Sequence, residues 1–155
     1  MKNQKEVWLP VKGYEGIYEV SNFGRVKRIG SFRGVNKKYL NNYFLTPMDN
    51  GKGYLRIKLT INNKSKRVML HRIIAEAFIK NELNKPFVNH IDSDKKNNLI
   101  SNLEWCTQSE NVCHAVKSGR WTQGFKKTYL TRKFTIEEVK EINEIYKRKI
   151  KELKK

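Results

Sequence analysis

Hydrophobic and polar positions alternate strictly over residues 53–61, and this period of two predicts a β-strand. The apolar side chains of the strand share one face: Leu55, Ile57, Leu59 and Ile61. The polar ones share the other face: Arg56, Lys58 and Thr60. Asn62-Asn63 begins a turn into residues 66–70, so we expect a β-hairpin. The cationic face either lies along a phosphate backbone or is an ordinary solvated surface.

Shorter segments on both sides of this hairpin have their own patterns. Residues 6–29 predict short strands joined by a tight turn at residues 21–24, and residues 30–50 are polar and predict a loop. Apolar residues recur at helical spacing over residues 71–79. Residues 87–91 and 103–106 predict two strands on either side of a turn rich in Asp, Lys and Asn.

Two capping boxes mark the starts of further helices. Thr107 with Glu110 predicts a helix that runs to about Ser118, and Thr135 with Glu138 predicts a basic C-terminal helix. Residues 120–132, between them, predict an irregular segment. Together the elements indicate an α+β protein.

Charge narrows the class of partner. The 155 residues contain 33 Lys and Arg against 15 Asp and Glu, a net charge of +18 that favours a polyanion. We favour nucleic acid over a membrane surface, because no amphipathic anchor stands out. Charge alone does not separate DNA from RNA.

Cysteine usage and the N-terminus bear on the compartment. Two cysteines, Cys106 and Cys113, are too few for a disulfide framework and lack the paired spacing of a structural zinc site. No apolar segment resembles a signal peptide or a membrane span. We therefore expect a cytoplasmic protein without structural zinc.

Candidate chemistry is concentrated in residues 71–114, which contain all three histidines. A hairpin packed on a helix would place His90 on a strand and Asn111 on the helix. The side-chain oxygens of Asn89 and Asn111 could then bind one hard cation such as Mg²⁺. A neutral imidazole at position 90 could take a proton from water, and a base with a Lewis acid is what phosphodiester hydrolysis needs.

Residues 69–116 resemble the HNH nuclease family, in particular its phage and intron-encoded homing endonucleases. The residues that carry the resemblance occur in order along the chain: His71-Arg72, Ala75, Phe78, Val88-Asn89-His90-Ile91-Asp92, Asn97-Asn98, Asn102-Leu103-Glu104-Trp105, Thr107 and Glu110-Asn111. Residues 6–29 are similar to an N-terminal module that often accompanies such nucleases. Residues 133–142 resemble the first helix of a helix-turn-helix.

The resemblance implies a ββα-metal core, a single divalent ion and a histidine base. It implies that His90 is the general base and Asn111 a metal ligand, whereas Asn89 occupies a position where many members have Asp. Asn102 matches the middle Asn, which holds the loop and orients the histidine strand, and is counted with His90 in the catalytic set. Ser93 stands where Gly often follows the Asp. The ion is expected to be Mg²⁺, with Mn²⁺ as the alternative.

The remaining side chains have weaker signals. Two hypotheses remain for His71 and His114. They contact a phosphate or the groups around the metal, or they have only a packing role in the protein interior. Trp8 and Trp105 are expected in the core. The basic residues expected to contact the DNA backbone are Arg25, Lys27, Arg28, Arg56, Lys58 and Arg72.

These patterns predict a DNA-contacting module at residues 1–66, a nuclease core at 67–119 and a basic helical segment at 120–155. The expected activity is hydrolysis of double-stranded DNA to 5′-phosphate and 3′-hydroxyl ends, by a monomer or a transient dimer. The alternatives are a DNA-binding protein with a degenerate site, for which Asn89 is the support, and an RNA-binding or RNA-cleaving protein.

Overall fold

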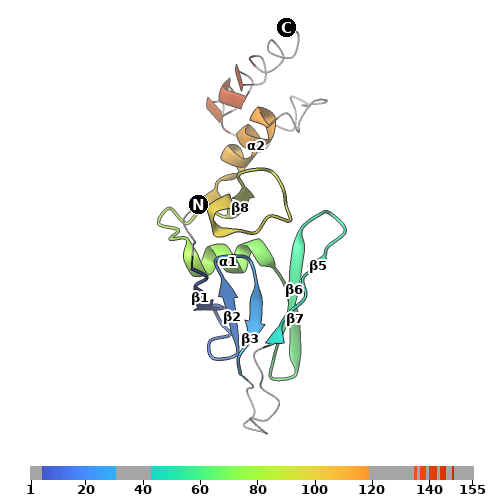
Figure 1. The fold of residues 1–155 in the computed structure, drawn as a ribbon. Coiled ribbons are helices and arrows are strands. Elements are labelled where there is room, and N and C mark those ends of the chain that lie inside the picture. Colours follow the sequence, from blue (N-terminus) through green and yellow to red (C-terminus); the bar gives the residue numbers. More distant parts are fainter. Residues whose placement is uncertain are drawn as a thin grey trace.

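The computed structural model describes residues 5–30, residues 43–118 and part of residues 135–148. Its elements stack along one direction, from the N-terminal strands through helix α1 to the β8 hairpin and helix α2 (Figure 1). Among the described residues, none of the helices has the length and apolar character needed to cross a bilayer.

The N-terminal sheet has four antiparallel strands in the order β1-β2-β3-β4. The strands are β1 (Trp8–Pro10), β2 (Tyr18–Ser21), β3 (Val26–Arg28) and β4 (Tyr43–Phe44). A tight turn joins β2 to β3, as predicted, with Gly24 N–H donating to the Ser21 carbonyl at 3.0 Å. The inner face of the sheet is apolar, since Val20 and Val26 are almost completely buried.

The second sheet contains the predicted hairpin. Its strands are β5 (Met48–Asp49), β6 (Leu55–Ile61) and β7 (Lys64–Met69), in that order. The predicted alternation is confirmed, because Ile57 and Leu59 are fully buried and Lys58 between them is exposed. Asn62 and Asn63 both have positive φ, 50° and 61°, as the two central residues of a type I′ hairpin turn require.

The expectation of a continuous loop over residues 30–50 was wrong at its C-terminal end. Tyr43–Phe44 pairs with β3, and Met48–Asp49 pairs with β6. Each strand has only two residues, which is too short for a hydrophobic period to appear in the sequence. Residues 31–42 of the predicted loop lie outside the described residues.

Helix α1 (Leu70–Phe78) joins the two sheets to the C-terminal half of the fold. Its buried face includes Ile73, Ile74 and Ala75, as the helical spacing predicted. α1 contacts strands of both sheets and also the hairpin that follows it (Figure 1). The sheets are also linked directly, because the buried Tyr18 hydroxyl donates to the Thr60 carbonyl at 3.3 Å and accepts from the Thr60 N–H at 3.1 Å.

The C-terminal half is a hairpin followed by a helix. Strand β8 (Phe87–His90) pairs antiparallel with β9 (Leu103–Cys106), and a short 3₁₀ turn, η2 (Ile100–Asn102), precedes β9. Helix α2 (Gln108–Lys117) then packs on both strands. The capping box is confirmed: Glu110 N–H donates to Thr107 Oγ1, and Thr107 N–H donates to the Glu110 carboxylate.

The second capping box is confirmed as well. Thr135 N–H donates to Glu138 Oε2 at 2.8 Å, and Glu138 N–H donates to Thr135 Oγ1 at 3.2 Å. The described residues between 137 and 148 are helical, and Ile142 and Ile145 are buried. Residues 120–132 lie outside the described residues, and the helix-turn-helix resemblance of residues 133–142, which are described in part, stays a prediction.

Candidate active site

His90 ends strand β8 and is 4% exposed. Its ring lies against two others: the centroid distances are 5.2 Å to His71 and 6.0 Å to Tyr54. Lys95 Nζ lies 4.5 Å from the centroid of the Tyr54 ring. The imidazole is therefore buried and packed against the rings of His71 and Tyr54.

Two carboxamides form the polar surroundings of this strand end. His90 Nε2 lies 3.2 Å from Asn98 Oδ1, within hydrogen-bonding distance. Next to it along the strand, Asn89 is 5% exposed and its Nδ2 donates to Glu104 Oε1 on β9 at 2.8 Å. An ionised carboxylate only accepts hydrogen bonds, so this contact fixes the orientation of the Asn89 amide and leaves Oδ1 as its remaining acceptor.

His71, at the start of α1, is buried and neutral at ordinary pH. Burial lowers the pKa of His71 to about 4, helped by the neighbouring His90 and Arg72. Its Nδ1 is buried and has no hydrogen-bond partner among the described residues. An uncharged ring in this position packs against His90 and offers no positive charge to a phosphate.

Asn102 controls the loop between the two strands. Its Nδ2 donates to Asp92 Oδ1 and to the Asn97 carbonyl, each at 2.8 Å, and its Oδ1 accepts from the Asp92 N–H at 2.9 Å. Hydrogen bonds from Asn97 and then Asn102 lower the pKa of Asp92. The contacts of Asn102 are with the loop, so we describe it as a positioning residue.

The loop turns at Ser93, which has a φ of 71°. Ser93 N–H donates to the His90 carbonyl at 3.0 Å, so the chain reverses directly after the histidine. The Ser at this position keeps the left-handed conformation for which Gly is usually favoured.

Asn111 and His114 lie one turn apart on α2. Among the described residues, the Asn111 carboxamide makes no hydrogen bond, whereas His114 Nε2 lies 2.9 Å from the Ile91 carbonyl. A carbonyl only accepts, so Nε2 of His114 is the donor. This contact ties the helix to the residue that follows His90, which is the packing role considered for His114.

The chemical type of the candidate ligand atoms, which are oxygens, suits a hard divalent ion. In the described part of the chain no group of three or more His, Cys, Asp or Glu side chains could hold a metal. The candidate ligands are instead the carboxamide oxygens of Asn89 and Asn111, on two elements that pack together. Neutral oxygen donors suit an ion such as Mg²⁺, which keeps several waters and binds phosphate directly.

The six predicted DNA contacts fall into two groups. Arg25 pairs with Glu6, Lys27 Nζ lies 2.8 Å from Glu19 Oε2, Arg28 Nε donates to the Gly30 carbonyl, and Arg72 donates to the Pro86 carbonyl and lies over the Trp105 ring. Arg56 and Lys58 lie on one face of β6 instead, without an ion pair among the described residues. Sequence reasoning missed Arg67, which the hairpin register places directly opposite Lys58.

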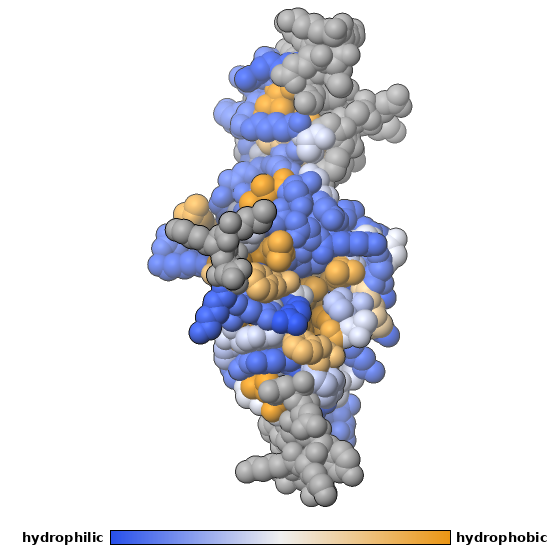
Figure 2. Space-filling model, in the orientation of Figure 1, coloured by the Kyte–Doolittle hydropathy of each residue, from blue (hydrophilic) through white to orange (hydrophobic). Residues whose placement is uncertain are grey.

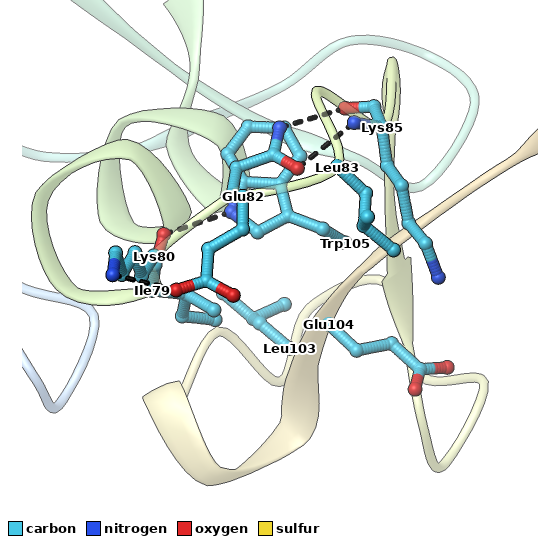
Figure 3. Close-up of a pocket in the computed structure, with 9 residues that line it drawn as sticks. Ile79, Lys80, Glu82, Leu83, Lys85, Leu103, Glu104 and Trp105 are labelled. Atoms are coloured by element: carbon cyan, nitrogen blue, oxygen red, sulfur yellow. Dashed lines mark hydrogen bonds and ion pairs between the residues drawn. The ribbon is translucent and has the colours of Figure 1, made fainter.

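One hollow in the described part of the chain has a lining that does not include His90. It has a volume of about 430 Å³, and its lining includes Lys80, Leu83, Lys85 and Trp105 (Figure 3). Trp105, expected in the core, is only partly buried, and its indole N–H donates to the Ile79 carbonyl at 3.0 Å. Trp8 is likewise only partly buried. His90, at the end of β8, does not line this hollow.

Sequence reasoning also missed Asn98 as a contact of His90, and it missed Tyr54 and Glu104. Asn98 belongs to the motif, but nothing in its spacing indicates which side chain it meets. The pairing of Asn89 with Glu104 follows from the register of the hairpin. That register could be predicted from the sequence only if the ends of both strands were already known.

Two family models match the chain. Residues 68–113 match the HNH endonuclease family, and residues 6–60 match the NUMOD4 motif. The first match covers the hairpin and most of α2, with His90, Asn102 and Asn111. The second covers the N-terminal sheet and most of β6.

Similar proteins are HNH endonucleases. The chain is 38% identical over 112 residues to the DNA endonuclease I-HmuI of Bacillus phage SP01, covering 72% of this chain and 59% of that protein. It is 40% identical over 120 residues to an uncharacterized HNH endonuclease of Acanthamoeba polyphaga mimivirus, covering 75% of this chain and 27% of the relative. The chain therefore spans between about a quarter and three fifths of the length of these relatives.

A solved structure shares the fold. The structure described as DNA binding and cleavage by the HNH homing endonuclease I-HmuI matches with a TM-score of 0.64 and 34% identity, over 79% of this chain and 64% of that one. HNH nucleases use a divalent metal. Sequence and fold thus agree across both the N-terminal sheet and the hairpin with its helix: the chain contains an HNH endonuclease family region at residues 68–113, preceded by a NUMOD4 motif at residues 6–60.

Proposed function

We propose that the protein is a metal-dependent DNA endonuclease that hydrolyses phosphodiester bonds and leaves 5′-phosphate and 3′-hydroxyl ends. The observation that carries the proposal is the position of His90, at the end of β8 beside the Asn89 carboxamide, with α2 packed on the same strand. This arrangement supports a site in which a histidine base acts beside carboxamide oxygens that could hold an ion.

His90 acts as the general base. Its imidazole takes a proton from water as the water oxygen attacks phosphorus, and the bond from phosphorus to the 3′ oxygen breaks. The 3′ oxygen leaves and is protonated by solvent. Asn102 serves this step indirectly, since it holds the loop that follows the histidine.

Asn89 and Asn111 would hold the ion through their side-chain oxygens. A bound Mg²⁺ or Mn²⁺ supplies a Lewis acid that stabilises negative charge on the leaving oxygen. Because both ligands are neutral, their affinity for the ion is expected to be lower than that of a site with a carboxylate. Glu104, which accepts a hydrogen bond from Asn89, places a carboxyl group next to this ligand.

Double-stranded DNA is the proposed substrate. The I-HmuI structure is described as showing DNA binding and cleavage, and the net charge of +18 suits a polyanion. Within the predicted contact set of Arg25, Lys27, Arg28, Arg56, Lys58 and Arg72, the two on β6 are the strongest candidates, because the other four already have partners in the fold. We expect a monomer, so the first product from a plasmid should be nicked circles.

The experiment uses supercoiled plasmid with Mg²⁺ or Mn²⁺, in parallel with single-stranded RNA. We expect nicking that a chelator abolishes and that His90→Ala reduces at least about 100-fold, with DNA binding retained in a gel shift. DNA binding without cleavage by the wild type would instead support the degenerate binder that Asn89 suggests. Cleavage of RNA alone would overturn the proposed substrate.

A second measurement addresses the ion directly. Mn²⁺ binding followed by electron paramagnetic resonance should weaken in Asn111→Ala by about 10-fold or more. Gln108→Ala is the matched control, because Gln108 is another half-buried carboxamide on α2. Equal affinities in both variants would remove Asn111 from the ion site.

A further inference from the structure

Asn98 is a buried carboxamide whose orientation is fixed by its surroundings. It is 5% exposed, and its Nδ2 donates to the Lys96 carbonyl at 2.9 Å. A backbone carbonyl cannot donate, so the nitrogen of the amide must face Lys96. Its oxygen, Oδ1, then faces His90 Nε2 at 3.2 Å.

This orientation determines the tautomer of the neutral imidazole. An amide oxygen only accepts, so Nε2 of His90 must carry the proton and donate it to Asn98. The ring lone pair is then on Nδ1, and that nitrogen is the one able to take a proton from water. In the opposite tautomer two acceptors would face each other across 3.2 Å, which is unfavourable in a buried place.

Asn98 is itself held by the N-terminal sheet. Gly24, in the turn between β2 and β3, has a φ of 80°, and a Cβ at this position would lie 2.9 Å from the Asn98 carbonyl oxygen and 3.2 Å from Asn98 Cβ. In the same turn the Asn22 carbonyl accepts from the Ile100 N–H at 3.0 Å. Only glycine both adopts this φ readily and allows the approach.

We propose that Asn98 is the positioning residue that holds His90 in the Nε2–H tautomer, and that the Ser21–Gly24 turn of the N-terminal sheet holds Asn98 in place. The inference rests on the proposed role of His90 as the base. It makes the N-terminal sheet a structural part of the catalytic centre, in addition to any contact that it makes with DNA. The turn and the asparagine are 74 residues apart, so one half of the fold shapes the base in the other.

The tautomer can be observed without any cleavage assay. We would record ¹⁵N NMR of the His90 ring in the metal-free full chain at alkaline pH, where imidazoles are neutral. We expect Nε2 to be protonated and Nδ1 unprotonated in the wild type, and a mixture in Asn98→Leu. A protonated Nδ1 in the wild type would overturn the inference, whether or not the protein cuts DNA.

Kinetics separate positioning from general damage. Asn98→Leu should lower kcat by about 100-fold and leave KM within about 2-fold, because DNA contacts are unaffected. Asn98→Asp keeps an acceptor oxygen toward Nε2, so kcat should recover to within about 10-fold of the wild type. Equal losses in both variants, with His90 ring signals unchanged in each, would mean that Asn98 matters only for packing.

The role of the turn is tested with a pair of glycine variants. Gly24→Ala should shift the His90 ring signals and lower kcat, with unchanged DNA affinity. Gly13→Ala is the matched control, since Gly13 has a φ of 78° but a Cβ there meets nothing within 4 Å. If Gly24→Ala and Gly13→Ala behave alike in both readouts, the turn does not position Asn98.

Discussion

The basic side chains of the N-terminal sheet and those of the β6–β7 hairpin have contrasting surroundings. In the sheet, Arg25 pairs with Glu6 and its guanidinium carbon lies 4.7 Å from the centroid of the Phe44 ring, while Lys27 pairs with Glu19. In the hairpin, residues 54–69 include five basic side chains and no acidic one. Among the described residues none of these five has an ion-pair partner.

The difference shows why counting charges does not locate a binding surface. A cation already paired with a carboxylate contributes little net field and must lose that partner to bind phosphate. Lys58 and Arg67 are directly opposite each other on adjacent strands, where like charges destabilise a sheet. An arrangement of this kind is favourable when a polyanion lies across it. Hydrophilic side chains cover much of the described surface in the view of Figure 2, so exposure alone would not have distinguished the two regions.

The largest expected effect comes from removing charge in each region separately. The double variant Lys58→Gln/Arg67→Gln should weaken DNA binding about 10- to 30-fold and reduce the salt slope by about two units, because two phosphate contacts are lost. Arg25→Gln/Lys27→Gln removes the same charge and should cost less than about 3-fold. Binding isotherms at several salt concentrations measure both. Similar losses of DNA affinity in the two double variants would show that the hairpin and the N-terminal sheet do not differ as binding surfaces.

His71 is a basic side chain that, unlike the exposed cations of the hairpin, is buried. The pKa of His71 is lowered to about 4 because it is buried, so the unfolded chain binds a proton at pH values where the folded protein does not. The titration of His71 therefore does not change the free energy of unfolding above about pH 6.5. Below that pH it lowers the free energy of unfolding progressively, down to about pH 4. We expect the wild type to lose about 2 kcal/mol more than His71→Phe between pH 8 and pH 5. Urea unfolding at both pH values tests this, and parallel losses would show that His71 is not the group responsible.

The two regions are joined through Tyr18, whose hydroxyl makes both of its hydrogen bonds to Thr60. Tyr18→Phe leaves the backbone N–H and carbonyl of Thr60 without this partner, which should cost about 1–3 kcal/mol of unfolding free energy. Tyr43→Phe is the control, because that side chain is half exposed, and should cost less than about 0.5 kcal/mol. Equal costs would mean that the sheets are not coupled through this hydroxyl.

The smallest expected effect comes from releasing the paired cations. Glu6→Gln/Glu19→Gln should increase DNA affinity by about 2- to 5-fold, since Arg25 and Lys27 lose their carboxylates. The loss of stability should stay below about 1 kcal/mol, because these pairs are at least partly exposed. Fluorescence anisotropy with labelled duplex measures the gain. An unchanged affinity would mean that this sheet faces away from the DNA.

Much of the fold could be predicted because its signals are local. The alternation over β6, the stripe of α1 and the capping boxes at Thr107 and Thr135 each depend on residues within one element. The two-residue strands β4 and β5 carry no such period, and they form only because their backbones pair with longer neighbours. The motif likewise indicated His90, Asn102 and Asn111 but gave no reason to connect Asn98 with the histidine.

The sequence by itself indicated the candidate site residues, the positive net charge and the order of the elements. These features could be predicted because composition, hydrophobic periodicity and helix capping depend only on residues close together in the chain. Which cations are paired, which nitrogen of His90 is protonated and which turn supports Asn98 were decided by the tertiary structure alone. A polar side chain bonds to whatever packing brings within about 3 Å. Gly24 and Asn98 meet only after the N-terminal sheet and the hairpin have packed around α1.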